Sequence, residues 1–183
     1  MSESPEKRKM SALEAMLDLN ITLAFAMKGE LKLDRLHHAL GLLQSKHPAL
    51  RMLPAVENGE HYWLQDCAPS IPLRVVDKAS ERDRAREIHA ETTAVFLPGQ
   101  PLLRLVWLRP AEGDQHDLLL TFCHSICDGS SAMLLIKELL QAMRSDAWDW
   151  TPYLQPTVQH ILGQAGTPVH AVRIRLLVGL LNG

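Results

Sequence analysis

The sequence predicts an α/β protein, in the range that also includes α+β folds, with a mixed β-sheet and helices packed on it. Short apolar segments alternate with segments of helical periodicity, in the order strand, helix, hairpin, helix, strand, strand, helix. The 183 residues suffice for one domain with a core. Hydrophobic residues make up 46% and charged residues 22% of the chain, the balance of an ordinary globular protein.

The first quarter of the chain predicts a tail, a strand and a helix. Residues 1–10 are polar and charged, and we interpret them as a flexible tail. A short helical turn over Ser11–Leu19 leads into an apolar strand, Ile21–Met27. Leucines then recur at helical spacing over residues 33–46. This helix should end before Pro48, because proline disfavours helical backbone at the preceding residue.

The middle of the chain predicts a hairpin and a second helix. Leu50–Val56 and Glu60–Leu64 flank Asn58-Gly59, and the Asn-Gly pair is a strong signal for a hairpin turn. A charged helix follows over Glu81–Val95, and Ser80 is placed to cap its first turn.

The second half predicts two strands and the strongest helix of the chain. Leu102–Leu108 and His116–Phe122 are the strands, joined by a turn at Glu112-Gly113-Asp114. Ser131–Met143 is the helix, with Ser130 as its expected N-cap. Residues 151–183 form a linker-like segment and an apolar C-terminal helix that is too short to cross a bilayer.

Composition disfavours several classes of function. The net charge is −2 and the basic residues do not cluster, which argues against nucleic acid and anionic membranes as partners. The first ten residues lack the apolar core of a signal peptide, so we expect a cytoplasmic protein. Three cysteines are an odd number, and we interpret them as reduced thiols.

The most informative feature is the segment Cys123–Ser130, in which a histidine follows an apolar strand and Asp-Gly opens a helix. Histidine can serve as a general base because its unperturbed pKa is near ~6.5, and a strand end holds it rigidly. Asp128 could orient the His124 ring directly, or it could fix the loop through an arginine. Gly129 suits a backbone conformation that a Cβ would disfavour.

Other interpretations of this segment compete with catalysis. His-x-x-x-Asp-Gly arises by chance in roughly two chains per hundred, and a lone histidine at a strand end is more often structural. Cys123-His124-x-x-Cys127 lacks both the usual zinc spacing and a grouped fourth ligand, so we predict no metal. Cys127 could form an acyl intermediate, but cysteines with apolar neighbours are more often packing residues.

A second region extends the pattern. Leu33-Asp34, Leu36 and Ala39-Leu40, followed by Lys46-His47-Pro48-Ala49-Leu50-Arg51, resemble the early conserved region of the condensation-domain superfamily. Ser11-Ala12-Leu13-Glu14 is similar to its opening. This superfamily includes peptide condensation domains and CoA-dependent acyltransferases such as chloramphenicol acetyltransferase. The resemblance implies a chloramphenicol-acetyltransferase-like fold, present here as a single N-terminal lobe over residues 11–150.

The resemblance also implies roles for individual residues. His124 matches the base that acts on the hydroxyl or amine attacking an acyl thioester. Asp128 matches a structural aspartate and Arg51 the arginine that pairs with it, an ion pair that would cost ~3–5 kcal/mol to break once buried. Gly129 matches the turn glycine near the path of the thioester. Cys123 stands where the family has its first histidine.

These matches lead to an expected function. The domain would move an acyl group from CoA, or from the phosphopantetheine arm of a carrier protein, to a hydroxyl or amine, with no bound cofactor. Cys123, Ser125 and Ser130 are candidate substrate-channel residues. The second lobe's Asp-Phe-Gly-Trp-Gly-like motif is missing, so a second lobe or a homo-oligomer would complete the site. The alternative is a non-catalytic binding module or an incomplete lobe that is inactive alone.

Overall fold

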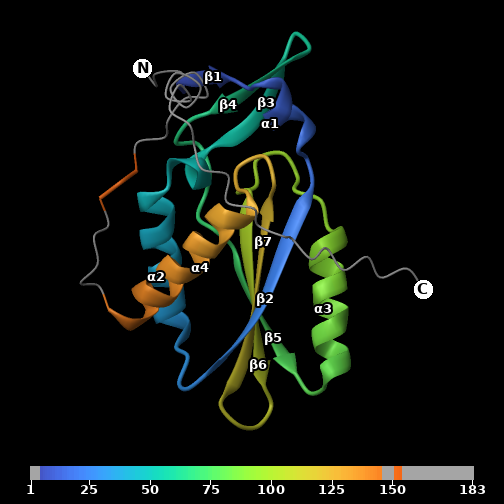
Figure 1. Cartoon of the computed structure of the whole chain (residues 1–183), viewed down its shortest axis with the longest axis vertical. Helices are drawn as coiled ribbons and strands as arrows, with labels where there is room; N and C mark the ends of the chain where they lie inside the picture. Colours follow the sequence, from blue (N-terminus) through green and yellow to red (C-terminus); the bar gives the residue numbers. More distant parts are fainter. Residues whose placement is uncertain (1–4, 146–150, 154–183) are drawn as a thin grey trace, which may run out of the picture.

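The computed structural model describes residues 5–145 and 151–153 and contains two β-sheets with helices packed against the larger one (Figure 1). The four-stranded sheet has the order β2 (Asn20–Lys28), β7 (Gln115–Cys123), β6 (Leu103–Pro110) and β5 (Leu73–Lys78). Its neighbours are antiparallel except β5 and β6, which are parallel. The mixed sheet confirms the predicted α/β fold class.

The smaller sheet has the order β1 (Lys7–Lys9), β4 (Glu60–Leu64) and β3 (Leu53–Glu57). The β3–β4 turn confirms the predicted hairpin, with positive φ angles of 53° at Asn58 and 80° at Gly59. Positive φ at both central residues is the backbone of the hairpin turn that Asn-Gly favours.

The helices lie on both faces of the larger sheet (Figure 1). On one face, α2 (Leu33–Lys46) and α4 (Gly129–Arg144) enclose the main core with the side chains of β6 and β7. On the other face, Ile88 of α3 (Glu81–Thr93) packs against Val106, Leu108 and Leu119. A short α1 (Ala12–Met16) and a 3₁₀ turn, η1 (Pro48–Arg51), complete the described elements.

Two capping interactions were predicted, with different outcomes. Ser80 caps α3 as expected, and Asp83 completes a reciprocal capping box. The N-cap of α4 is Asp128 instead of Ser130, because the Asp128 carboxylate accepts a hydrogen bond from the Ser131 N–H at 2.7 Å. The helix therefore begins two residues earlier than its apolar periodicity indicates.

One other prediction needs correction, one strand was not predicted, and one prediction falls outside the described residues. The segment expected to be a flexible tail contains β1, which pairs with β4. Strand β5 was not predicted. The apolar C-terminal helix expected within residues 151–183 falls almost wholly outside the described residues. Within residues 5–145 and 151–153, no helix combines the length and apolar character needed to cross a bilayer.

Candidate functional site

The backbone of the larger sheet positions His124. Strand β7 ends at Cys123, which is paired with Asn20 of β2. The His124 N–H then donates to the carbonyl of Leu19 at 2.7 Å, which extends the β2–β7 pairing by one residue. A turn follows, in which the Ile126 N–H donates to the Cys123 carbonyl at 3.2 Å. The imidazole is therefore mounted directly on the sheet, as its place after a strand predicted.

The His124 ring is partly exposed, with one nitrogen buried. Among the described residues, none forms a hydrogen bond with its Nδ1 atom. Asp128 does not orient the ring through that atom, because its carboxylate caps α4. Hydrogen bonds from the backbone and side chain of Ser131 hold the pKa of Asp128 below its usual range, and the nearby His124 adds to this shift.

The predicted ion pair between Arg51 and Asp128 is not formed. The Arg51 guanidinium contacts the carboxylate of Asp66 and donates to the carbonyls of Gln44 at 3.1 Å and Ser45 at 2.6 Å. Those carbonyls belong to the last turn of α2, where helix geometry leaves acceptors without intrahelical partners. Arg51 follows that turn directly, so it caps α2 instead of reaching the motif loop.

Gly129 also differs from expectation. It is the first residue of α4, and its φ angle is not positive. A Cβ added there would meet nothing within 4 Å. The backbone therefore does not require glycine at this position. A role in leaving open space for a thioester stays a prediction.

The candidate channel residues divide between two environments. Cys123 and Ser125 line a cavity of about 450 Å³, and the Cys123 Sγ lies 2.9 Å from the Ser125 Oγ. Glu14 and Asp18 contribute carboxylates to the same cavity. Ser130 is exposed in the first turn of α4.

The motif contains two buried cysteines, Cys123 and Cys127. Burial, with the nearby charge of Asp128, raises the pKa of Cys127 to about 12, so its thiol is protonated near neutral pH. Over residues 5–145 and 151–153, no group of three or more His, Cys, Asp or Glu residues could hold a metal ion.

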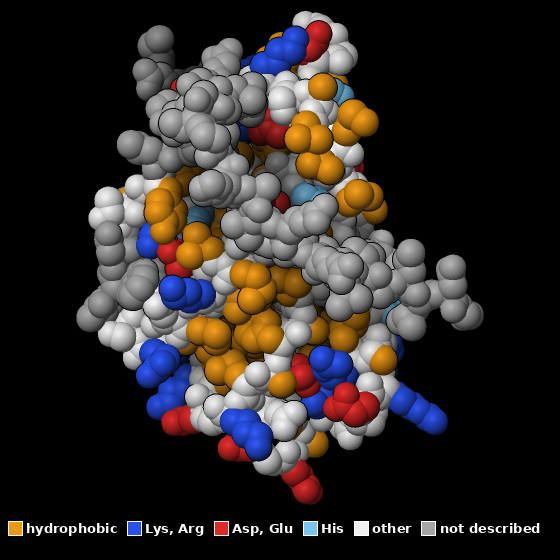
Figure 2. All heavy atoms as spheres, in the orientation of Figure 1, with side chains coloured by type: hydrophobic (Ala, Val, Ile, Leu, Met, Phe, Trp, Pro, Cys, Tyr) orange, Lys and Arg blue, Asp and Glu red, His pale blue; other side chains and the backbone are white. Residues whose placement is uncertain are grey.

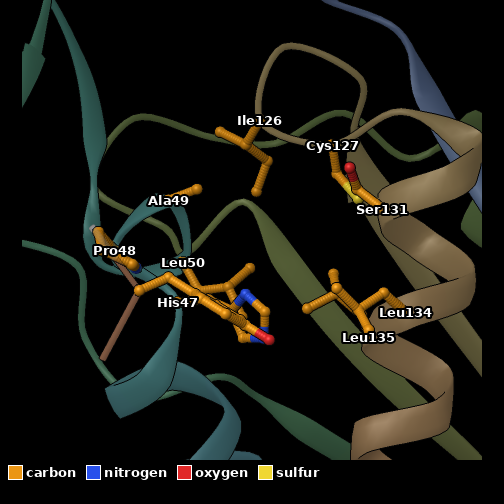
Figure 3. A pocket seen from close by; sticks show the side chains of 10 residues that line it. His47, Pro48, Ala49, Leu50, Ile126, Cys127, Ser131, Leu134 and Leu135 are labelled. Carbon is orange, nitrogen blue, oxygen red and sulfur yellow. The ribbon is translucent and has the colours of Figure 1, made fainter. Parts of the chain in front are cut away.

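A second cavity, of about 350 Å³, is lined by two other residues of the motif loop, Ile126 and Cys127 (Figure 3). Its walls come from η1, the motif loop and α4, and its rim includes His47 and Tyr153. The sequence did not assign either residue to a site, although His47 lies within the early region that resembles the family. Figure 3 shows the side chains of residues 47–50 on one side of this space, those of Leu134 and Leu135 from α4 on the other, and Ile126 from the loop above it.

A buried ionic network stands behind one wall of this second cavity. Glu138, which is 1% exposed, accepts a hydrogen bond from the Tyr153 hydroxyl at 3.0 Å and pairs with Lys46 at 2.9 Å. Its other oxygen contacts the Nε2 atom of His47. Burial alone would raise the pKa of Glu138, but the hydrogen bonds from Lys46 and His47 outweigh it and lower that pKa.

Comparison with known proteins decides the family. The model of the condensation domain matches residues 13–147, more than half of the chain, and the match includes the motif loop and the early region around Arg51. The chain belongs to the condensation-domain family. The resemblance carried by the His124 motif and the early region is therefore confirmed.

The chain is also similar to individual relatives and solved structures. Surfactin synthase subunit 2 of Bacillus subtilis is 32% identical over 123 residues, which cover 67% of this chain and 3% of that protein. The starter condensation domain of the rhizomide synthetase RzmA has a TM-score of 0.69 at 15% identity. The condensation domain of the Monacolin K polyketide synthase MokA has a TM-score of 0.67 at 18% identity.

These matches also show what share of each related structure the chain covers. The chain covers 40% of the RzmA structure and 37% of the MokA structure. At these identities the likeness to both structures concerns the fold alone. It shows that the sheet and helices described here are those of one portion of a condensation domain.

Proposed function

We propose that this condensation domain takes part in transfer of an acyl group from a thioester to an amine or hydroxyl, with His124 as general base. The donor would be an acyl group on CoA or on a carrier-protein phosphopantetheine arm. The observation that carries the proposal is the position of His124: a partly exposed residue fixed to the end of β7, in a loop whose residues line two cavities.

The reaction requires the protein to orient the two substrates and to supply a base. The imidazole takes the proton of the attacking amine or hydroxyl while a bond forms to the thioester carbonyl carbon. Collapse of the tetrahedral intermediate breaks the carbon–sulfur bond, and the imidazolium returns its proton to the leaving thiolate. A protein-bound acyl intermediate is unnecessary, which agrees with the raised pKa of Cys127.

The ring must present a lone pair to the nucleophile. Because Nδ1 is buried, we assign the basic lone pair to Nε2, and Nδ1 then carries the ring hydrogen. The rest of the His124 side chain is partly exposed. We expect a second lobe or a second copy of this chain to complete the site over this exposed part of the ring.

The outer strand of the larger sheet supports this expectation. Strand β2 pairs on one side with β7 and is the last strand in its sheet order. Figure 2 shows hydrophobic side chains gathered over the middle of the face on which β2 lies. Contiguous apolar surface of this kind typically marks a contact with another protein surface.

The test compares His124→Ala with His37→Ala, the same change at an exposed position of α2. Both variants are made in the full native polypeptide, and single-turnover transfer is measured from acyl-CoA and from an acylated carrier protein. Loss of a general base should lower the rate of His124→Ala by about 10²–10⁴-fold. His37→Ala should keep the wild-type rate, and both variants should keep the wild-type melting temperature.

The outcomes separate catalysis from the alternative of a non-catalytic binding module. A His124→Ala protein that transfers as fast as wild type would exclude His124 as the base. Thioester binding without any transfer by the wild-type polypeptide would favour the binding module.

A further inference from the structure

We propose that a third cavity, at the opposite end of β2 from His124, binds an anionic amphiphile: one molecule with an alkyl chain and a carboxylate or phosphate group. The cavity has a volume of about 640 Å³ and lies between the end of β2, the start of α2 and the end of α4. Its lining contains no residue of the His124 motif.

The cavity is remote from the motif loop. Strand β2 begins at Asn20, which pairs with Cys123, and ends at Lys28, which pairs with Gln115 and lines the cavity. At ~3.3 Å per residue, a strand of this length separates the cavity from the motif loop by on the order of 25 Å. Figure 1 shows this end of β2 running into the start of α2, close to the last turn of α4. A ligand held here is therefore distinct from a substrate at His124.

Positive charge is concentrated in the lining. It contains four basic residues and one acidic residue, a formal net charge of +3, although the whole chain carries −2. The basic residues are Lys28, Lys32, Arg35 and Arg144, and the acidic residue is Glu30. The sequence has no basic run here, because the fold brings the end of α4 to the segment between β2 and α2. Figure 2 shows Lys and Arg side chains at this end of the molecule beside hydrophobic ones. Such a field attracts an anion.

Two of these cations have no carboxylate partner among residues 5–145 and 151–153. Glu30 pairs with Lys32 at 3.4 Å, whereas neither Lys28 nor Arg144 forms an ion pair with a described residue. Both side chains are exposed. The Nε atom of Arg35 donates to the Met143 carbonyl at 3.1 Å, which holds its guanidinium between α2 and α4. The ammonium of Lys28 and the guanidinium of Arg144 can therefore receive an oxyanion.

The floor of the cavity is apolar. Four partly buried side chains line it and pack against the main core: Met27, Leu31, Leu140 and Met143. Their remaining exposed surface is in contact with water, and covering it with methylene groups is favourable. An inorganic anion would use only the charges, and a neutral alkyl chain only the floor. A ligand that satisfies both must carry an anionic group on an alkyl chain.

The segment that carries much of the lining is held by hydrogen bonds to the β6–β7 region. The Gly29 N–H donates to the Asp114 carbonyl at 3.1 Å. The indole N–H of Trp107 donates to Nδ1 of His116 at 3.1 Å, so Nε2 carries the ring hydrogen and donates to the Gly29 carbonyl at 3.1 Å. A cavity with a fixed wall loses little conformational entropy when a ligand binds.

The size of the charged region favours one small ligand over an extended polyanion. A nucleic acid or an anionic membrane would also contact surface outside the cavity, where the rest of the chain is net acidic. A single amphiphile contacts only the basic lining and the apolar floor.

The test measures binding by isothermal titration calorimetry with the native polypeptide, below the micelle concentration of each probe. Octanoate and octyl phosphate are the anionic probes, and the tighter of the two identifies a carboxylate or a phosphate as the preferred head group. Octyl glucoside and octyltrimethylammonium should bind about tenfold more weakly, because they cannot pair with the two cations. From hexyl to decyl phosphate, each methylene should raise the affinity by up to about fourfold.

Variants locate the charged part of the site. Lys28→Gln and Arg144→Gln should each weaken octyl phosphate binding about threefold, the usual worth of an exposed charge pair. Lys137→Gln is the matched control, since Lys137 is an exposed residue of α4 outside the lining, and it should bind as wild type does.

A second pair of variants locates the apolar part. Leu31→Asn places an amide on the floor and should reduce the gain in affinity per methylene. Leu33→Asn is its control, because Leu33 is 43% exposed and lies outside the lining. Thermal melts verify that each variant is folded.

Equal affinity for octyl phosphate and octyl glucoside would overturn the proposal, as would equal affinity for octyl phosphate and inorganic phosphate. Equal weakening by Lys137→Gln and Arg144→Gln would also overturn it, because binding would then follow net charge alone. His124→Ala should bind octyl phosphate as wild type does. Loss of acyl transfer in that variant therefore leaves this site unaffected, and absence of octyl phosphate binding leaves the role of His124 unaffected.

Discussion

Replacing Glu138 by glutamine should cost this domain a large share of its stability. Glu138 is 1% exposed, and its side chain bonds Lys46, His47 and Tyr153. The substitution keeps the shape and removes the carboxylate charge that pairs with the buried ammonium of Lys46, itself 4% exposed. Breaking a buried pair on one side typically costs about 3–5 kcal/mol.

That cost is a substantial part of the ~5–15 kcal/mol that ordinarily separates folded from unfolded domains. At this chain length it corresponds to a fall in melting temperature on the order of 10 °C. Urea unfolding followed by circular dichroism measures the free energy directly. Glu112→Gln, in the exposed β6–β7 turn, is the matched control and should change stability by less than about 0.5 kcal/mol.

A second variant separates loss of charge pairing from loss of packing. Lys46→Met combined with Glu138→Leu removes both charges and keeps apolar volume, and such replacements are often neutral or stabilising. The double variant should therefore recover most of the stability lost in Glu138→Gln. A loss below about 1 kcal/mol for Glu138→Gln would refute the reasoning that Lys46 depends on this carboxylate.

Two further predictions concern the motif loop and the N-terminal segment. Arg51→Ala should cost about 2 kcal/mol through its lost bonds to the α2 carbonyls, and Asp128→Ala about 1 kcal/mol through its lost cap. In the double variant Arg51→Ala/Asp128→Ala, the loss of stability measured by thermal melts should equal the sum of the two single losses within about 0.5 kcal/mol. A coupling energy above about 1 kcal/mol would instead indicate that Arg51 and Asp128 interact. Burial alone would raise the pKa of Glu14, but the hydrogen bonds from Arg8 and Ser11 lower it from 4.5 to about 2. The ionised Glu14 side chain therefore contributes fully to stability above pH 4.5, and this contribution is lost as the pH falls through about 2. Glu14→Gln should make stability fall less steeply with pH in this acid range. An unchanged acid range would contradict the lowered pKa of Glu14.

The elements that sequence periodicity predicted are those whose signals are local. The helix over residues 33–46 ends as expected before Pro48, and the Asn58-Gly59 turn forms the expected hairpin. The His124 loop was also found from a local signal, because an apolar strand, a turn and an amphipathic helix follow one another without a gap. In each case neighbouring residues determine the backbone.

The elements that sequence periodicity missed depend on distant partners. Lys7–Lys9 has no apolar alternation. It nevertheless forms a strand, because its backbone pairs with the edge of β4 and because Arg8 forms a salt bridge with Glu14. Strand β5 becomes recognisable through its parallel pairing with β6, which lies beyond α3 in the chain. The role of Arg51 was misassigned for a different reason. The resemblance supplied a distant partner, Asp128, whereas the guanidinium binds the carbonyls at the neighbouring end of α2.

The geometry of the motif loop explains how a family motif can tolerate changed side chains around its histidine. One end of the loop is held by backbone pairing, through the Asn20–Cys123 register and the His124 N–H bond to Leu19. The other end is held by the Asp128 cap on α4. Neither restraint uses the side chain at position 123, where the Cys123 sulfur contacts Ser125. A substitution there changes the lining of the neighbouring cavity while the mount of the imidazole stays the same. A substitution at Cys123 that keeps this backbone pairing should therefore leave the proposed general base in place.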